Sequence, residues 1–291
     1  MPDQRGFEEL CDVKDLPREL YAWSLSGKGV KDFRDGTAVW WLQILQDVYY
    51  NADPKTHGRN SWGYTVLRTV YTNESDKLFP IAVERLKRWV VSYYVHSTRF
   101  PSWGARGIAQ QKTDGSVNDE LGRRFRLEVL EDKDRLNFPS LENASHDDVS
   151  KLCKHFRQWT VSVGADPNAD ERNPRLHDFL AMDENSVRFL AALTDETPPL
   201  RVITNFLEKR EWLRDSDSAY LWLLDSRAVE DWDGEDGSFR GWMKMEAGYI
   251  GYAWFQRARR MDREKHILTN RWAVTTHLVP EGSGDYWFEA V

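Results

Sequence analysis

The chain has 291 residues, of which 41% are hydrophobic and 13% aromatic, so it can bury a sizeable core in one large or two small domains. Its formal net charge of −7 excludes a general electrostatic attraction to nucleic acids or anionic membranes, so either contact needs a local basic patch. Its two cysteines, Cys11 and Cys153, lie outside any CxxC pattern, which argues against a zinc site or a disulfide framework and predicts a reducing compartment.

The N-terminal segment has no apolar run of signal-peptide length, and no stretch of about 18 apolar residues occurs in the sequence. We therefore expect a cytoplasmic protein that does not contact a membrane. Residues 1–36 are charged and interrupted by proline and glycine, which predicts an irregular lead-in. Since no linker is recognisable, we expect a single α+β domain over residues 1–291.

The first predicted helix is "TAVWWLQILQDVYYN" (37–51), whose apolar residues recur at helical spacing. A loop over 51–62 leads to a strand in "SWGYTVLRTVY" (61–71). Asn73 to Asp76 offer helix caps, and the apolar spacing that follows predicts a helix of about five turns. Residues 97–122 lack any period and predict a long loop.

The second half alternates predicted strands and helices. "RRFRLEVLED" (123–132) alternates apolar residues with Arg124, Arg126 and Glu128, as an antiparallel or edge strand does. Ser145 and Asp148 have capping-box spacing before a helix that reaches residue 163. The further predicted segments are a strand at 176–182, a helix at 184–193, a strand near 200–207, "YLWLLD" (220–225), an acidic loop at 230–237, "GWMKMEAGYIGYAWFQRARR" and "RWAVTTHLV". This order predicts an α+β fold, ferredoxin-like or related, with helices packed on one face of the sheet.

Arg68 falls among the apolar residues of the strand at 61–71 and has two interpretations. In the structural one, its aliphatic stem packs along the strand and its guanidinium reaches a carboxylate at the sheet edge. In the functional one, it binds a carboxylate or phosphate in a pocket through two parallel hydrogen bonds. Tyr71 lies on the opposite face of an ideal strand and shares that pocket only if the strand twists or bulges.

Three acidic residues follow predicted strands: Asp183, Glu184 and Asp225. The structural interpretation is helix capping, in which carboxylates accept hydrogen bonds from free amides. The functional one is that the acids converge in one cleft and there receive a cationic group or transfer a proton.

A basic run follows Trp254 and Phe255 and comprises Arg257, Arg259, Arg260, Arg263 and Lys265. Basic residues beside aromatic ones can bind a phosphate backbone and stack bases. A solvated helix face, balanced by Asp262 and Glu264, accounts for the same residues.

The sequence contains no GxGxxG after a strand, no P-loop, no HExxH and no GxSxG motif. His146 and His155 are nine residues apart, too far to share a ligand face on a helix. We expect no metal and no cofactor, and we assign no catalytic residue.

Several motifs carry a resemblance: W-G-Y-x-V-x-R-T-x-Y at 62–71, the segment from "RRFRLEVLED" to "HDDVSKLCKHFRQW", "MDENSVRFL" and "GWMKM". Together they resemble a widespread, mostly uncharacterised group of ascomycete fungal proteins, over roughly residues 40 to 255. The group is similar in turn to the fungal arginine-containing cyclodipeptide synthases, which join two amino acids delivered on aminoacyl-tRNAs. No catalytic motif of that class can be matched residue by residue.

The resemblance implies a cytoplasmic biosynthetic enzyme with aminoacyl-tRNA and an amino acid or other small molecule as partners. Asp183, Glu184 or Asp225 would then accept the guanidinium of the arginyl group. Trp62 and Trp242 would form the walls of the substrate pocket. Arg68 and the basic run at 257–265 would bind phosphates of the tRNA.

Two other classes of function stay open. A non-catalytic ligand- or partner-binding protein needs an aromatic pocket but no activated nucleophile. A cofactor-independent isomerase or cyclase needs only an acid, a base and aromatic walls.

Overall fold

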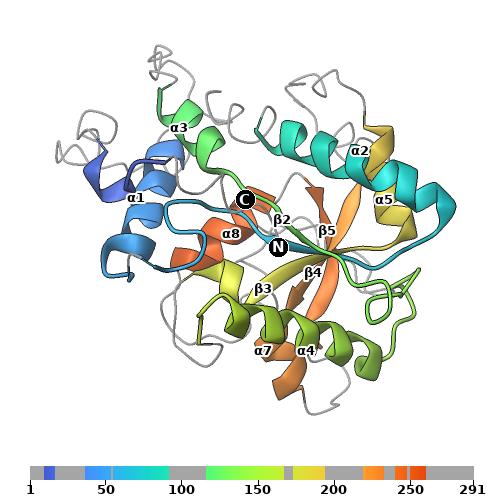
Figure 1. Ribbon diagram of the computed structural model, residues 1–291. Coiled ribbons are helices and arrows are strands. Elements are labelled where there is room, and N and C mark those ends of the chain that lie inside the picture. Colours follow the sequence, from blue (N-terminus) through green and yellow to red (C-terminus); the bar gives the residue numbers. More distant parts are fainter. Residues whose placement is uncertain are drawn as a thin grey trace, which may run out of the picture.

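The computed structural model in Figure 1 combines helices with a five-stranded sheet, which confirms the predicted α+β class. The residues that it describes are 10–16, 37–53, 55–91, 116–166, 173–193, 219–232, 240–247 and 250–259. The strands predicted near 200–207 and in "RWAVTTHLV", and most of the lead-in at 1–36, lie outside them.

The sheet is mixed and has the strand order β2-β1-β3-β4-β5. Its strands are β1 (Thr65–Arg68), β2 (Glu128–Leu130), β3 (Asp178–Met182), β4 (Tyr220–Asp225) and β5 (Trp242–Glu246). β1 is parallel to β2 and β3, whereas β4 is antiparallel to β3 and β5. The order is one that doubly wound sheets use, but with β4 reversed. Helices separate all successive strands of the described chain, so the arrangement differs from the β-α-β-β-α-β order of a ferredoxin-like fold.

Helices cover both faces of the sheet, which corrects the expectation that they pack on one face (Figure 1). They are α1 (Thr37–Tyr50), α2 (Asn73–Trp89), α3 (Ser116–Arg124), α4 (His146–Ser162), α5 (Glu184–Ala192), α7 (Ser226–Asp231) and α8 (Ile250–Arg259). Leu180 and Met182 of β3 face the core formed with α1, α2, α5 and α8, while Phe179 and Ala181 face the core formed with α4 and α7. Because β3 and β4 are nearly continuous apolar runs, both of their faces need a helical cover.

Side-chain caps begin α2 and α4. The Ser145 hydroxyl accepts a hydrogen bond from the Asp148 amide at 3.2 Å, as the spacing of the two residues predicts. The cap of α2 is Thr72, which precedes the predicted candidates Asn73 to Asp76 and forms a capping box with Ser75. Both long helices therefore start close to the positions that the sequence indicates.

The region around β2 differs from the prediction in two ways. Part of the segment expected as a loop at 97–122 forms α3, while residues 92–115 lie outside the described part of the chain. β2 is an edge strand, as one predicted alternative had it, but it pairs in parallel. Arg124, expected on the polar side, is fully buried. Its charge is compensated there by Glu120, one helical turn away, to which it donates a hydrogen bond at 2.7 Å.

The remaining described segments follow the prediction more closely. β3 and α5 occupy the strand and the helix expected at 176–182 and 184–193. The predicted acidic loop at 230–237 begins inside α7, and residues 233–239 lie outside the described part. The candidate acids are thereby divided between the two ends of β3.

Candidate functional site

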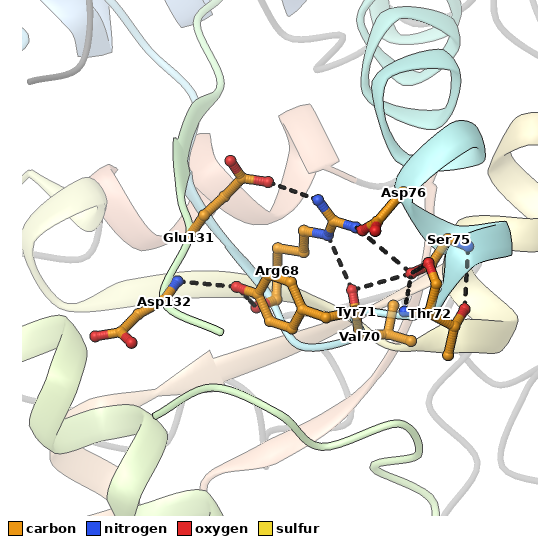
Figure 2. Close-up of polar contacts among 8 residues, drawn as sticks. All are labelled: Arg68, Val70, Tyr71, Thr72, Ser75, Asp76, Glu131 and Asp132. Carbon is orange, nitrogen blue, oxygen red and sulfur yellow. Dashed lines mark hydrogen bonds and ion pairs between the residues drawn. The ribbon is translucent and has the colours of Figure 1, made fainter. Parts of the chain in front are cut away.

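Arg68 is the last residue of β1 and lies at the carboxyl ends of the parallel strands. It is largely buried, with 10% of its side chain exposed (Figure 2). Its guanidinium donates to the Glu131 carboxylate at 2.9 Å and to the Val70 carbonyl at 2.9 Å. It also pairs with Asp76. These contacts are the ones that the structural interpretation predicts, although β1 lies inside the sheet and not at its edge.

Tyr71 lies against Arg68, because β1 ends at Arg68 and the chain then turns into α2. The Arg68 Cζ atom is 4.6 Å from the centre of the Tyr71 ring, a cation–π contact. The Tyr71 hydroxyl donates to the Arg68 carbonyl and accepts from the Asp132 amide (Figure 2). Burial raises the pKa of the Tyr71 phenol. The Arg68 guanidinium also lies 3.5 Å from the Ser75 hydroxyl, and we call Arg68, Tyr71, Ser75, Asp76 and Glu131 the Arg68 cluster.

The connection between β2 and α4 crosses this same edge of the sheet. The Phe138 amide donates to the Thr69 carbonyl at 2.7 Å, and the Glu184 amide donates to the Pro139 carbonyl at 3.0 Å. In doubly wound folds the carboxyl ends of neighbouring parallel strands form the usual ligand crevice. Here backbone hydrogen bonds of the chain itself bridge the ends of β1 and β3.

Asp183 is the N-cap of α5, as the capping interpretation predicts. It is fully buried, and its carboxylate accepts from the Ser186 amide and hydroxyl, the Leu141 amide and the Trp222 indole. Four donors on two carboxylate oxygens leave little capacity for a further donor. Asp183 therefore joins β3, α5, β4 and the connection before α4.

The three acids predicted to converge do not do so. Because β3 and β4 are antiparallel, Asp225 lies opposite Asp178 at the start of β3, whereas Asp183 and Glu184 follow its end. Glu184 is partly exposed and pairs with Arg188 one turn along α5 at 2.8 Å. Asp225 is thus separated from the other two acids by the length of β3.

Asp225 instead meets Asp178 and Arg257 in a buried cluster. Arg257 Nε and Nη2 donate to the two oxygens of Asp178 at 2.7 Å each, and Nη2 also donates to Asp225 at 2.6 Å. Asp178 and Asp225 are 0% and 1% exposed. This bidentate geometry with a third bond is the one by which carboxylates select a guanidinium over an ammonium. We call Asp178, Asp225, Arg257 and the adjacent Tyr64 the Arg257 cluster.

The cluster shifts the protonation equilibria of its members. Burial raises the pKa of Asp178 to about 6, with Asp225 adding to the rise and Arg257 opposing it. The two aspartates raise the pKa of Arg257 although burial lowers it, so its guanidinium stays charged. Burial and the neighbouring Asp178 raise the pKa of the Tyr64 phenol well above its usual value. Asp178 is therefore a carboxyl group whose pKa lies well above its usual range, because it is buried beside a second carboxylate.

Tyr64 directly precedes β1, and the glycine before it, Gly63, allows the chain to approach the segment before β2 closely. Gly63 has a φ of 121°, and a Cβ atom there would lie 2.1 Å from the Arg126 carbonyl oxygen. This close approach lets the chain before β1 pair with the chain before β2. The Tyr64 hydroxyl is buried and has no hydrogen-bond partner within the described residues.

Trp62 and Trp242 do not line a common pocket. Trp62 is fully buried in the core on the α8 face, where its ring lies 5.1 Å from Phe255 and 6.4 Å from Trp41. Trp242 belongs to the core on the α4 face. The predicted walls are therefore parts of two cores on opposite faces of the sheet.

The predicted nucleic-acid-binding run is described only in part. Arg257 is bound to Asp178 and Asp225 and so differs from a solvated arginine that faces a phosphate backbone. The side chain of Arg259 and all of Arg260, Arg263 and Lys265 lie outside the described part of the chain. A role of these four in RNA binding stays a prediction.

Sequence reasoning missed Asp178, Tyr64 and the neighbouring His177. His177 accepts a hydrogen bond from the Arg227 guanidinium at 2.8 Å, and its carbonyl accepts from Ser226. One signal was present: "HDFLAM" places two ionisable residues directly before a run of four apolar residues. Such placement predicts that they are buried at the strand end and need partners there.

Among the residues that the structure describes, no three His, Cys, Asp or Glu side chains are grouped to bind a metal ion. The same residues include no helix with the length and apolar composition needed to cross a bilayer. No protein-family model, curated protein or solved structure matches the chain.

Proposed function

We propose that the protein is a biosynthetic enzyme that recognises an arginyl group, namely an arginine-containing cyclodipeptide synthase, the class that we link to the fungal group its motifs resemble. The observation that carries the proposal is the acid pair of the Arg257 cluster. Asp178 and Asp225, from neighbouring strands, accept three short hydrogen bonds from the guanidinium of the chain's own Arg257. A carboxylate pair so arranged distinguishes arginine from lysine.

The structure changes which acids the proposal uses. Asp225 stays as a guanidinium acceptor, and Asp178 joins it from the opposite strand position. Asp183 is left out because its oxygens already bind four donors, and Glu184 because it lies beyond the far end of β3. Asp178, with its raised pKa, is the group of this cluster suited to exchange a proton with a bound amine.

Reconstitution of the reaction tests the proposal. Purified protein is incubated with total tRNA, aminoacyl-tRNA synthetases, ATP and all amino acids, and cyclic dipeptides are measured by mass spectrometry with and without ribonuclease. We expect an arginine-containing product that ribonuclease abolishes. No product from demonstrably charged tRNA would refute the proposal and favour a non-catalytic binding protein.

Matched carboxylate-to-amide variants test whether Asp178 and Asp225 recognise the arginyl group. Asp178→Asn and Asp225→Asn should each lower the yield by at least about tenfold, since each removes half of a buried charged acceptor pair. Glu230→Gln on α7 is the control, because Glu230 is half-exposed and pairs with Arg157. Circular dichroism melting of each variant separates lost folding from lost recognition. Equal yields from all variants would place recognition elsewhere.

A further inference from the structure

The carboxylate pair of the Arg257 cluster is built by the sheet, independently of the helix that supplies the guanidinium. Asp225 Oδ1 caps α7 by accepting from the Arg227 and Ala228 amides at 3.0 Å each, which leaves Oδ2 for Arg257. Asp178 lies directly opposite Asp225 in the β3–β4 register. The two acceptors are thus positioned by backbone pairing and by a helix cap, and α8 contributes the cation alone.

The attachment of α8 rests on its apolar side chains. Trp254 and Phe255 are fully buried, and the Phe255 ring stacks on Trp41 with centroids 4.6 Å apart. Burying aromatic side chains of this size contributes several kcal/mol. Arg257 lies in the last turn of α8, and 12% of its side chain is exposed. Because these apolar side chains anchor α8, exchange of the guanidinium would require a change in the Arg257 side chain and no movement of the helix.

Losing the guanidinium without a replacement would be unfavourable, because the pair would then lose its counter-charge or Asp178 would have to bind a proton. Two carboxylates that are 0% and 1% exposed would repel each other if the guanidinium left without replacement. A second guanidinium that enters as Arg257 leaves restores the same set of hydrogen bonds, so the exchange avoids this cost. A lysine ammonium would not, because it lacks the planar fork. The buried Tyr64 hydroxyl, which has no partner among the described residues, offers an additional acceptor beside the pair.

We infer that Arg257 is an internal competitor, whose guanidinium occupies the Asp178–Asp225 pair until the guanidinium of a ligand displaces it. The inference rests on the proposed function for the identity of the site but adds its regulation. In the free protein Arg257 occupies the pair, so the apparent affinity for a ligand is the intrinsic affinity multiplied by the fraction of molecules in which Arg257 has left the acids. Weakening the Arg257 contacts should therefore strengthen ligand binding.

Nitrogen NMR of the full chain tests the exchange directly. Ethylguanidinium is titrated into uniformly ¹⁵N-labelled protein, and the Arg257 Nε–H resonance is identified by its absence in Arg257→Lys. We expect this resonance to shift or disappear saturably with ethylguanidinium but not with n-propylammonium. A resonance that stays unchanged at saturating ethylguanidinium would overturn the inference, because Arg257 would then be a permanent structural ion pair.

Calorimetry of the variants gives the second readout. Arg257→Lys keeps the positive charge but loses the bidentate geometry, so it should bind ethylguanidinium at least about tenfold more tightly than the wild type. Arg157→Lys on α4 is the control and should bind as the wild type does. Equal affinities of Arg257→Lys and the wild type would contradict the inference.

The two proposals fail separately. Displacement of Arg257 without any cyclic dipeptide leaves the guanidinium site intact and refutes the synthase. Product formation that needs Asp178, together with an unchanged Arg257 resonance, retains the synthase and refutes the competitor.

Discussion

Arg68 and Arg257 are each held by two carboxylates, but Arg68 lies at the carboxyl end of β1 and Arg257 at the opposite end of the sheet, beside the start of β3. The partners of Arg68, Asp76 and Glu131, have side chains that are 53% and 52% exposed. The partners of Arg257 are 0% and 1% exposed. Solvent screens the first set of charges and not the second, so equal numbers of ion pairs have unequal energetic weight. The two arginine side chains are similarly exposed, at 10% and 12%, so the exposure of the carboxylate partners is what distinguishes the two clusters.

The largest expected effect is that of Asp178→Ala. It removes both hydrogen bonds that Asp178 accepts from Arg257, and two buried hydrogen bonds between charged groups are together worth about 3–5 kcal/mol. We expect the free energy of unfolding in urea to fall by that amount, while Asp76→Ala changes it by about 1 kcal/mol or less. Similar losses for the two variants would show that the two edges do not differ as their exposure indicates.

Asp183→Ala should have the next largest effect. It removes the cap of α5 and leaves the Leu141 amide and the Trp222 indole without their acceptor. A lost cap and buried unpaired donors together cost about 3 kcal/mol. Thermal melting measures the loss, and Ser145→Ala, which removes only the exposed cap of α4, should cost about 1 kcal/mol. A loss for Asp183→Ala no greater than that for Ser145→Ala would contradict its role in joining the elements.

The pH dependence of stability tests the raised pKa of Asp178 in the Arg257 cluster. The pKa of Asp178 is about 6 in the folded protein and 3.8 for a free carboxyl, so between these values the folded state binds more protons than the unfolded state. Its contribution to the free energy of unfolding therefore falls as the pH rises from about 4 to about 6, by at most about 1.4 kcal/mol per pH unit. Urea unfolding from pH 4 to 7.5 should show this slope as the difference between the wild type and Asp178→Asn. Parallel curves would contradict the raised pKa.

The local features of the fold follow from the sequence because they depend on neighbouring residues. Ser145 and Asp148 mark the start of α4, and the apolar runs at 178–182 and 220–225 form strands. Those same runs, apolar at nearly every position, also indicate strands covered on both faces, which the single-face prediction overlooked. What propensity and spacing do not contain is the direction in which β4 runs.

That direction decides the candidate site. Asp183 and Asp225 both follow strands and look equivalent in the sequence, yet the antiparallel pairing of β3 and β4 places them at opposite edges of the sheet. Arg257 meets Asp178 across 79 positions of the chain, a contact that no local pattern encodes. Trp62 and Trp242 were likewise assigned to one pocket although the sheet separates them.

The smallest expected effects are those of Glu131→Gln and Asp76→Asn, which change the half-exposed carboxylates around Arg68. Each removes one half-exposed carboxylate while Arg68 keeps its hydrogen bond to the Val70 carbonyl and its contacts with the Tyr71 and Phe79 rings. Each change should cost about 0–1 kcal/mol in urea unfolding and should fall towards zero in about 1 M salt. Asp178→Asn, measured beside them, should lose much less of its effect in salt, because the Arg257 cluster is shielded from solvent ions. If salt reduced all three effects alike, the Arg257 cluster would be open to solvent and its acids would not form a buried pair.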